Sequence, residues 1–581
     1  MFHEEGRCGV AAPVSVHFQW NRGHGAHVVR AQQSCKLHLS SGSNDGRRRS
    51  VVSFVYCPDD LHSPVLTVQS EVAFGPENLA LPQPEIAARV DWALDVTGMA
   101  GMRTATVLTL SGGQKQRTAI AATLAMRPRL LVLDEPLSDL DPVGAQEVLA
   151  TLRRLAGDAV TGVIIIEHRV DEVVPWADRV VLMHEGRVVL DRHPRGAWDD
   201  PRPWAVAGVG VPDVVQLAAA VPGAFPAGSP LSVDEAVEAL RGSWFAAALA
   251  ATARDRCEHP GLAGCPAAPA ATAAPVAPAA RVAQGRVAAT GPAAVAGPGA
   301  GPGQAPVLSW EGVSVTFGAH KAIDNVSLSI TDGEWVALIG ANGSRKSTLT
   351  GLTVGLGTPS GGMVRFRGQR VRPGRVFEHA AQVALLLQAA DEMLFAEMVL
   401  DELEIGFRFR ARPENPVLDV PGALEFFGFS GLEAASPWEL SQGGRQRLAL
   451  AALLVGAPGV LVLDEPTSGQ DADRMRSFLR LLDRIRERTG LTIITVTHDM
   501  RSVASRAARI VLLGEGKVRL DGPAGHVFAH TAELEKWSVL APPLARLQSR
   551  LLGPGACPVL LDVGPLAAAM TGSATVLAGT A

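Results

Sequence analysis

One stretch decides how this chain folds: Gly340-Ala341-Asn342-Gly343-Ser344-Arg345-Lys346-Ser347-Thr348. It follows the pattern G-x-x-x-x-G-K-[ST], in which backbone N–H groups surround nucleotide phosphates, the lysine reaches the β- and γ-phosphates and the hydroxyl binds Mg²⁺. Arg345 departs from this pattern, because it stands where the second glycine is expected. The apolar run before the loop, residues 334–339, is typical of a buried strand, and Ser347 can begin a helix that faces the phosphates. Taken alone, the imperfect match is equally typical of an ordinary strand-to-helix turn.

A set of motifs occurs twice in the chain. Leu110-Ser111-Gly112-Gly113-Gln114 precedes an Ala-rich helix and reappears as Leu440-Ser441-Gln442-Gly443-Gly444. An apolar strand that ends in Asp134-Glu135 reappears before Asp464-Glu465, and a strand that ends in His168 reappears before His498. The interval is the same for every pair (440 − 110, 464 − 134 and 498 − 168 all equal 330), so the sequence predicts two tandem copies of one domain. Strands that alternate with helical segments predict a parallel sheet covered by helices.

Composition narrows the class of protein. The net charge is −5, with 53 Lys and Arg against 58 Asp and Glu, which argues against a nucleic-acid partner. The six cysteines form no C-x-x-C pair, so neither a zinc site nor a disulfide framework is indicated, and a reducing cytosol is expected. We find no run of about 18 apolar residues and no basic-then-apolar leader, so a role at a membrane would require partner chains.

The sequence divides into five segments. Residues 1–50 show no sustained periodicity, and we expect them to be non-native or disordered. Residues 51–245 form the first domain, residues 246–306 an Ala/Pro/Gly-rich linker and residues 307–540 the second domain. Residues 541–581 form a C-terminal extension, whose Ala541-Pro542-Pro543 is similar to Gly210-Val211-Pro212 after the first domain.

Together, these motifs resemble the ATP-binding cassette (ABC) family. The resemblance rests on the phosphate loop, the L-S-G-G-Q signature, the strand ending in Asp-Glu-Pro, the Ser-x-x-Asp loop and the strand-end histidine. It covers roughly residues 55–245 and 306–570. It implies an α/β fold of two tandem P-loop NTPase-type nucleotide-binding domains, the first truncated or degenerate at its N-terminus. It also implies ATP and Mg²⁺ as cofactors.

One subgroup is the most similar. Phe74-Gly75-Pro76-Glu77-Asn78, Gln388-Ala389-Ala390-Asp391 and Ser468-Gly469-Gln470-Asp471 look like the ATPases of energy-coupling-factor importers, which take up vitamins or transition-metal ions. The resemblance implies that the two cassettes pair head to tail within one chain, with ATP between them. It implies two partners, a transmembrane coupling subunit and a substrate-capturing membrane subunit, and a location at the cytoplasmic face of the cell membrane. The cargo stays open, because the membrane partners select it.

The resemblance assigns roles to individual residues. Asp464 would hold Mg²⁺ through water, Glu465 would orient or deprotonate the attacking water, and His498 would bind the γ-phosphate. Lys346 and Ser347 would hold the phosphates and Mg²⁺. Two assignments compete with ordinary structural roles. Gln388 would contact Mg²⁺ and water, or it is an ordinary polar loop residue. Phe317 would stack on the adenine, or it is a core residue. The remaining binding residues are Gly340, Asn342, Gly343, Ser344, Arg345, Thr348 and the signature residues Ser111, Gly112, Gly113 and Gln114.

The first cassette departs from the family pattern. Lys346 precedes Gln388 by 42 positions, and the same count back from Tyr56, which replaces the expected glutamine, reaches Val14. Nothing near Val14 resembles a phosphate loop, which indicates a displaced start or a reading-frame change upstream of about Val51.

We therefore expect two unequal sites. One would combine the remnants Asp134, Glu135 and His168 with Ser441 and Gly443 of the second signature, and we expect no hydrolysis there. The other would combine the only phosphate loop with the first signature. Arg345 crowds this loop, so we expect weakened nucleotide binding. The leading interpretation is an ATPase that drives import. The alternatives are a catalytically impaired assembly subunit and, less consistent with the net charge, a soluble remodeller of ribosomes or RNA.

Overall fold

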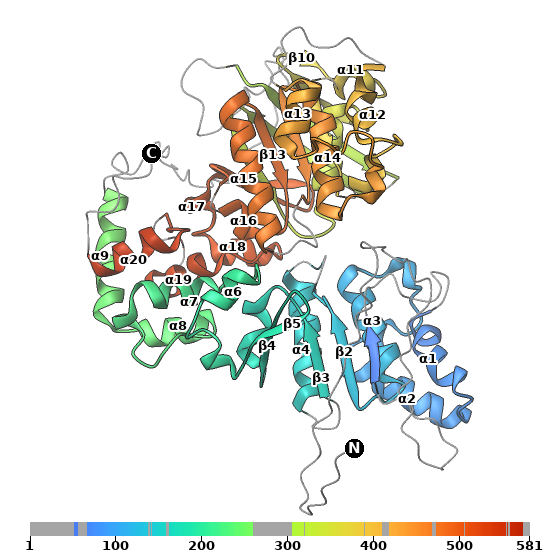
Figure 1. The fold of residues 1–581 in the computed structure, drawn as a ribbon, viewed down its shortest axis with the longest axis vertical. Coiled ribbons are helices and arrows are strands. Elements are labelled where there is room, and N and C mark those ends of the chain that lie inside the picture. The colour runs from blue at the N-terminus through green and yellow to red at the C-terminus, as the bar shows by residue number, and fades with distance from the viewer. Residues whose placement is uncertain are drawn as a thin grey trace, which may run out of the picture.

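The computed structural model describes residues 52–55, 67–137, 140, 142–157, 162–258, 305–318, 320–380, 382–388, 390–408, 418–466, 472–504, 506–553, 555 and 558–572. Two α/β cassettes are joined by helices at their C-terminal ends (Figure 1). The second cassette lies at the top of that view and the first at the bottom, with the joining helices on the left. The expectations for residues 1–50, for Tyr56 and for residues 468–471 fall outside the described residues.

The second cassette is built on a six-stranded sheet in the order β11-β12-β13-β8-β14-β15. The first five strands are parallel and β15 is antiparallel to β14. Parallel strands are covered on both faces, which explains their nearly continuous apolar sequences. The strands are β8 (Trp335–Ile339), β11 (Val383–Leu386), β12 (Val460–Asp464), β13 (Thr492–Val496), β14 (Arg509–Gly514) and β15 (Lys517–Pro523).

A second sheet covers one face of these strands. Its order is β10-β9-β6-β7, all antiparallel, and its apolar side shares a core with Val336, Leu338 and Val511 of the larger sheet. The strands are β6 (Leu308–Phe317), β7 (His320–Ile330), β9 (Gly361–Phe366) and β10 (Gln369–Arg370).

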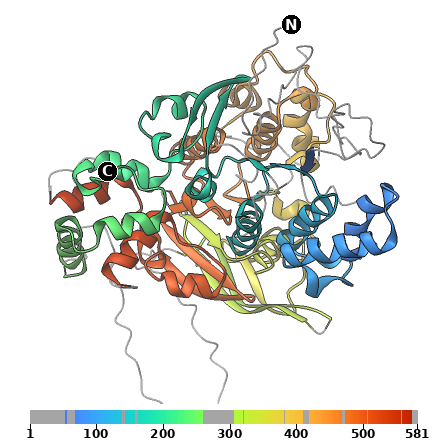
Figure 2. The ribbon, with the colours of Figure 1, turned by 90° about the horizontal axis from the view of Figure 1, so that it is seen from below.

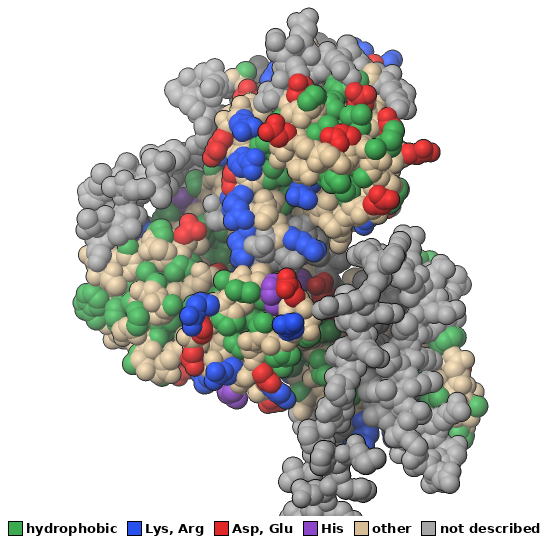
Figure 3. Space-filling view, in the orientation of Figure 1, with side chains coloured by type: hydrophobic (Ala, Val, Ile, Leu, Met, Phe, Trp, Pro, Cys, Tyr) green, Lys and Arg blue, Asp and Glu red, His purple; other side chains and the backbone are tan. Residues whose placement is uncertain are grey.

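Most helices of the second cassette pack on the opposite face around a separate core, whereas Leu349 of its first helix lies in the core that the two sheets share. The longest, α15, buries Phe478 and Leu482 and carries arginines on its outer side, as expected for an amphipathic helix, and Figure 3 shows a row of basic side chains there. The helices are α10 (Lys346–Gly351), α11 (Val376–Ala380), α12 (Val399–Glu404), α13 (Val420–Phe427), α14 (Gln442–Val455), α15 (Ala472–Thr489), α16 (Met500–Ala504), α17 (Ala524–Val527) and α18 (Thr531–Lys536).

The first cassette repeats part of this plan. Strands β1 (Val52–Val55), β2 (Leu130–Asp134) and β3 (Gly162–Ile166) form a parallel sheet, and β4 (Val180–His184) and β5 (Arg187–Arg192) form a separate hairpin. Its helices enclose one apolar core. They are α1 (Val68–Asn78), α2 (Gln83–Val96), α3 (Gly112–Leu124), α4 (Pro142–Gly157) and α5 (Val170–Val173).

The two cassettes differ at one strand. In the second cassette, β8 lies between β13 and β14 and pairs with both, whereas no strand among the described residues joins their counterparts β3 and β4. Four apolar side chains on these two strands are 41–53% exposed: Ile164, Ile166, Val181 and Met183. Their counterparts in the second cassette are at most 2% exposed: Ile494, Val496, Val511 and Leu513. The described part of the first cassette therefore lacks the strand that leads into the phosphate loop in the second.

Helices from both halves share a core beside the cassettes. α6 (Arg202–Val206), α7 (Asp213–Ala220), α8 (Val233–Leu240) and α9 (Trp244–Glu258) lie beside α19 (Pro543–Leu552) and α20 (Val563–Thr571), as Figures 1 and 2 both show. Leu217 and Leu240 are in one apolar cluster with Leu547 and Met570. The predicted linker boundary differs from the structure here, because residues 246–258 belong to helix α9.

The exposed strands yield a matched pair of substitutions. We expect Ile166→Thr to change the free energy of unfolding by less than about 0.5 kcal/mol, because its side chain is exposed. The corresponding Val496→Thr buries a hydroxyl in the core and should cost about 1–3 kcal/mol. Urea unfolding of both variants checks this. Equal destabilisation by the two variants would mean that β3 is covered in solution.

Candidate active site

The phosphate loop, residues 340–348, connects β8 to α10. Lys346 is 6% exposed, and its Nζ donates to the carbonyl oxygens of Gly340 at 2.8 Å and Ala341 at 3.0 Å, and to Ser344 Oγ at 3.4 Å. These three acceptors match the three donors of an ammonium group. The lysine charge therefore lies inside the loop.

Two backbone positions in this loop constrain the residue type. Gly340 has φ +154°, and a Cβ there would lie 2.4 Å from the carbonyl oxygen of Leu513. Arg345 has φ +74° and ψ +25°, in the left-handed region, directly before α10. The left-handed conformation costs a residue with a Cβ about 1–2 kcal/mol, which is the physical reason for glycine at this position.

The Arg345 side chain takes a different course from the one expected. It is exposed, and its Nη2 lies 3.4 Å from Nε2 of His320 at the start of β7. The loop thus keeps its path with an arginine present, and the disadvantage of Arg345 lies in its strained backbone. Weakened nucleotide binding stays a prediction.

Asp464 and Ser347 form a site suited to a hard cation. Asp464 ends β12, and its carboxylate accepts a hydrogen bond from the Ser347 hydroxyl. Burial raises the pKa of Asp464, and the neighbouring Glu465 raises it further, while the bond from Ser347 lowers it. Two adjacent oxygen ligands in a partly desolvated position fit Mg²⁺, which binds proteins through one or two carboxylates and retains several waters.

Glu465 and His498 form a pair at the ends of adjacent strands. Glu465 Oε2 lies 2.9 Å from His498 Nδ1 and also accepts from the His498 backbone N–H at 3.3 Å. Glu465 has φ +48°, and its own N–H donates to the Val496 carbonyl oxygen at 2.8 Å. For His498, burial lowers the pKa, but the hydrogen bond and charge of Glu465 raise it, and the net shift is upward. A strained carboxylate held by a histidine suits the role of a general base.

The first cassette retains the same local geometry. Glu135 has φ +46°, and its Oε1 lies 3.5 Å from His168 Nδ1. The interaction of the His168 ring N–H with the Glu135 carboxylate, which accepts from it, is the largest effect that raises the pKa of His168. Burial raises the pKa of Asp134 at the end of β2. The three remnant residues lie together, but the contact between Glu135 and His168 is looser than the 2.9 Å contact between Glu465 and His498, and Glu167 Oε1 lies 3.4 Å from the same His168 nitrogen.

The two signature segments begin their helices differently. Ser111 caps α3 and forms a full capping box with Gln114: Ser111 Oγ accepts from the Gln114 N–H at 3.4 Å, and Gln114 Oε1 accepts from the Ser111 N–H at 2.9 Å. Ser441 caps α14, since its Oγ accepts from the Gly444 N–H at 3.2 Å. Gly444 has no side chain, so the capping box is incomplete there. Gly113 packs closely, since a Cβ there would lie 3.0 Å from Gly144 Cα, whereas Gly443 faces open space.

The remaining predicted residues lie on the surface. Phe317 ends β6 and is 60% exposed, so it is not a core residue and its ring is available for stacking. Gln388 lies two residues after β11 and is exposed. The pairing of the phosphate loop with the first signature stays a prediction.

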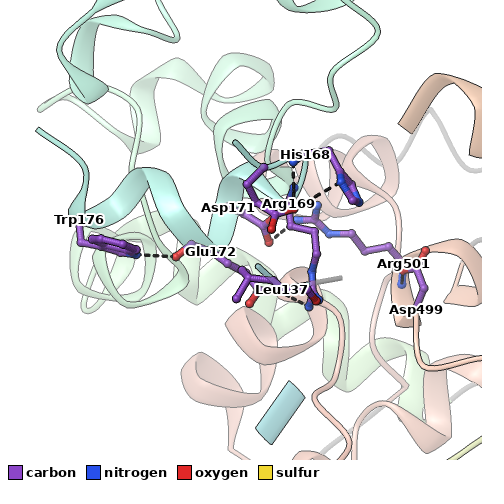
Figure 4. A network of polar contacts seen from close by, with 9 residues as sticks. Leu137, His168, Arg169, Asp171, Glu172, Trp176, Asp499 and Arg501 are labelled. Carbon is purple, nitrogen blue, oxygen red and sulfur yellow. Dashed lines mark hydrogen bonds and ion pairs between the residues drawn. The ribbon is translucent and has the colours of Figure 1, made fainter. Parts of the chain in front are cut away.

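One feature escaped the sequence analysis: a polar network beside the two histidine strands, drawn in Figure 4. Arg501 of α16 reaches Asp171 of α5 across the boundary between the cassettes. A cleft of about 620 Å³ opens beside it, and His168, Glu465 and His498 contribute to its lining. The only sequence signal was that positions 171 and 501 are equivalent in the repeat and carry opposite charges.

The Glu465–His498 pair predicts a pH dependence of stability. Because the pKa of His498 is raised on folding, the pair stabilises the fold at pH values below the ordinary histidine pKa of about 6.5, and this contribution is lost as pH rises through the raised pKa. We expect Glu465→Gln to destabilise the chain by about 1–2 kcal/mol near pH 6 and by less near pH 8.5. Urea unfolding at both pH values measures the difference. The pairing is contradicted if the destabilisation caused by Glu465→Gln is the same at both pH values. It is also contradicted if the same destabilisation is seen when His498 has been replaced by Asn.

Comparisons with known proteins identify the family of this chain. A family model described as ABC transporter matches residues 29–138 and 323–468, one segment in each half. A putative ABC transporter ATP-binding protein of Methanosarcina acetivorans is 35% identical over 493 residues, which cover 83% of this chain and 74% of the relative. The putative HMP/thiamine import ATP-binding protein YkoD of Bacillus subtilis is 27% identical over 83% of this chain and 78% of its own length.

Among solved structures, cbiO1 of Clostridium perfringens, described as part of the ABC transporter complex cbiONQ, is 29% identical. It covers 42% of this chain and 99% of its own, with a TM-score of 0.37. The family match in both halves confirms the expected fold class, two ABC ATPase regions with the P-loop NTPase fold. With relatives above 30% identity across most of both chains, this chain belongs to the ATP-binding proteins of ABC transporters.

Proposed function

We propose that this chain is the ATP-hydrolysing subunit of an energy-coupling-factor importer for a vitamin or a transition-metal ion. One observation carries the hydrolysis: Lys346, Ser347, Asp464, Glu465 and His498 converge at the carboxyl ends of β8, β12 and β13. The importer type is supported by the motif similarities after β11 and in α1, and by the similarity to the putative HMP/thiamine import protein of Bacillus subtilis.

Each residue has a defined task in this proposal. Lys346 and the loop residues Gly340, Asn342, Gly343, Ser344 and Thr348 hold the phosphates of ATP, and Phe317 stacks on the adenine. Ser347, Asp464 and Gln388 hold Mg²⁺, which supplies charge neutralisation at the phosphates when bound. Glu465 accepts a proton from the attacking water, and His498 orients Glu465 and donates toward the γ-phosphate.

The two sites are unequal in this proposal. The hydrolysing site takes the N-terminus of α3, with Ser111, Gly112, Gly113 and Gln114, from the first cassette. The remnants Asp134, Glu135 and His168 would face Ser441 and Gly443 without a phosphate loop, so no hydrolysis occurs there. Residues 51–245 and 307–540 are the two cassettes in this scheme.

The partners follow from the importer type. A transmembrane coupling subunit and a substrate-capturing membrane subunit would bind the cassettes at the cytoplasmic face of the membrane. Within the described residues, no helix is both long and apolar enough to cross a membrane. Co-purification of the chain with a membrane subunit from native membranes tests this part of the proposal separately from hydrolysis.

A matched pair of glutamate substitutions tests the hydrolysing site. We expect Glu465→Gln to lower steady-state ATPase activity at least about 100-fold, the usual contribution of a general base. Glu135→Gln, the equivalent change in the first cassette, should alter activity less than twofold. If wild type is no more active than Glu465→Gln, the chain is instead a non-hydrolysing nucleotide-binding or assembly subunit. Equal losses in both variants would mean two working sites.

Substitutions at position 345 separate strain from charge. We expect Arg345→Gly to bind a fluorescent ATP analogue up to about 5–30-fold more tightly, because about 1–2 kcal/mol of left-handed strain lowers the population of the binding-competent loop in the free chain and glycine removes that strain. Arg345→Ala keeps the strain and removes the guanidinium, so its affinity should stay close to that of wild type. Equal affinities of the glycine and wild-type chains would refute the weakening by Arg345.

A further inference from the structure

The two halves of the chain meet around an approximate twofold axis. Helices α19 and α20 are the repeat equivalents of α7 and α8, since their first residues differ by the common interval (543 − 213 and 563 − 233 both equal 330). α8 packs against α19, and α7 packs against α20, so each contact has a reciprocal partner. This reciprocity is characteristic of an isologous interface, in which equivalent surfaces face each other. At the axis of such an interface, a residue meets its own equivalent.

Asp171 and Arg501 occupy this central position. They are equivalent residues, since 501 − 171 is 330, and Arg501 Nη2 lies 2.9 Å from Asp171 Oδ2. Arg501 Nε is also 3.6 Å from Asp213 at the start of α7. The side chains of Asp171 and Arg501 are only 24% and 34% exposed. Figure 4 shows the Arg501 side chain extending from the second cassette toward α5 of the first.

The charges around the axis are reversed between the halves. The first half carries Arg169 and Asp171, and the second carries Asp499 and Arg501 at the equivalent positions. Asp213 has Pro543 as its equivalent, and Arg546, which lines the cleft, has Gln216 as its equivalent. Arg169 is bound within its own half, to the Leu137 carbonyl oxygen and to Glu172. At the axis itself, Asp171 and Asp213 of the first half face Arg501 of the second half, and Asp499 of the second half adds a carboxylate whose charge acts on both Arg501 and Asp213.

We propose that this charge reversal makes the face of each half specific for the other half and rejects a second copy of itself. If two first-half faces paired, Asp171 would meet Asp171, and if two second-half faces paired, Arg501 would meet Arg501. Like charges a few ångströms apart in a half-buried position repel strongly, so both self-pairings are disfavoured. The heterotypic pair alone places opposite charges at the axis. The interface therefore selects the two different cassettes as partners.

Single charge reversals in the full chain reproduce each rejected pairing. Arg501→Asp places a carboxylate opposite Asp171, as in a pair of first halves, and Asp171→Arg places a guanidinium opposite Arg501, as in a pair of second halves. We expect each to lower the thermal unfolding midpoint by about 2–4 °C or more, and to raise the radius of gyration in small-angle scattering as the cassettes separate. Arg501→Asp should be the more severe, because Asp213 also lies beside position 501.

The exchanged variant, Asp171→Arg with Arg501→Asp, restores opposite charges in the reverse order. It should recover at least half of the shift seen in the worse single variant, both in midpoint and in radius of gyration. Full recovery is not expected, because Asp213 then lies beside a carboxylate at position 501 rather than a guanidinium. If Arg501→Asp alone does not fold, a folded exchanged variant counts as the expected recovery.

A pair of similar chemistry away from the axis serves as control. Arg179 and Asp191 form an exposed ion pair on the β4–β5 hairpin, with Nε 2.7 Å from Oδ1. Reversal of either residue should leave the radius of gyration unchanged. The proposal is overturned if the exchanged variant loses as much in unfolding midpoint as the two single variants lose together. It is also overturned if the single reversals at the axis leave the radius of gyration unchanged, as those at the control pair should.

Discussion

The nucleotide site of this chain depends on strand β8, which is hydrogen-bonded on both sides. Its neighbours β13 and β14 pair with it in parallel, so its carboxyl end has no freedom to move without breaking two ladders. The phosphate loop begins directly after this strand, with Gly340 packed against the Leu513 carbonyl oxygen on β14. Asp464 ends β12 and His498 follows β13 at the same edge of the sheet. The position of every proposed catalytic group therefore derives from one set of strand pairings.

Among the described residues of the first cassette, no strand pairs with both β3 and β4. The strained backbone of Glu135 and its contact to His168 persist, because they depend on β2 and β3 alone. The apolar side chains that would lie against a central strand, such as Ile166 and Met183, are exposed instead. The catalytic remnants are thus local features of two strands, whereas a phosphate loop requires the complete sheet.

Much of this arrangement was predictable from the sequence, because the motifs are local and repeat at one interval. The strands that lead to Asp134, Asp464, His168 and His498 were all identified from short apolar runs. Three features were not predictable. Helix α9 lies within an Ala-rich segment whose prolines begin only after it ends, so composition alone misplaced the boundary. The left-handed backbone of Arg345 depends on the loop around it. The pairing of Asp171 with Arg501 joins residues from opposite halves of the chain, and no local pattern indicates such a contact.

The apolar core shared by α7, α8, α19 and α20 bears on how the chain is made. Leu217 and Leu240 are synthesised long before Leu547 and Met570, which complete their core. At about 5–20 residues per second, the first half waits on the order of 20–60 seconds for these final helices to emerge from the ribosome. During that interval its C-terminal helices expose an unmatched apolar surface. The last helices of the chain therefore determine when the first half can finish folding.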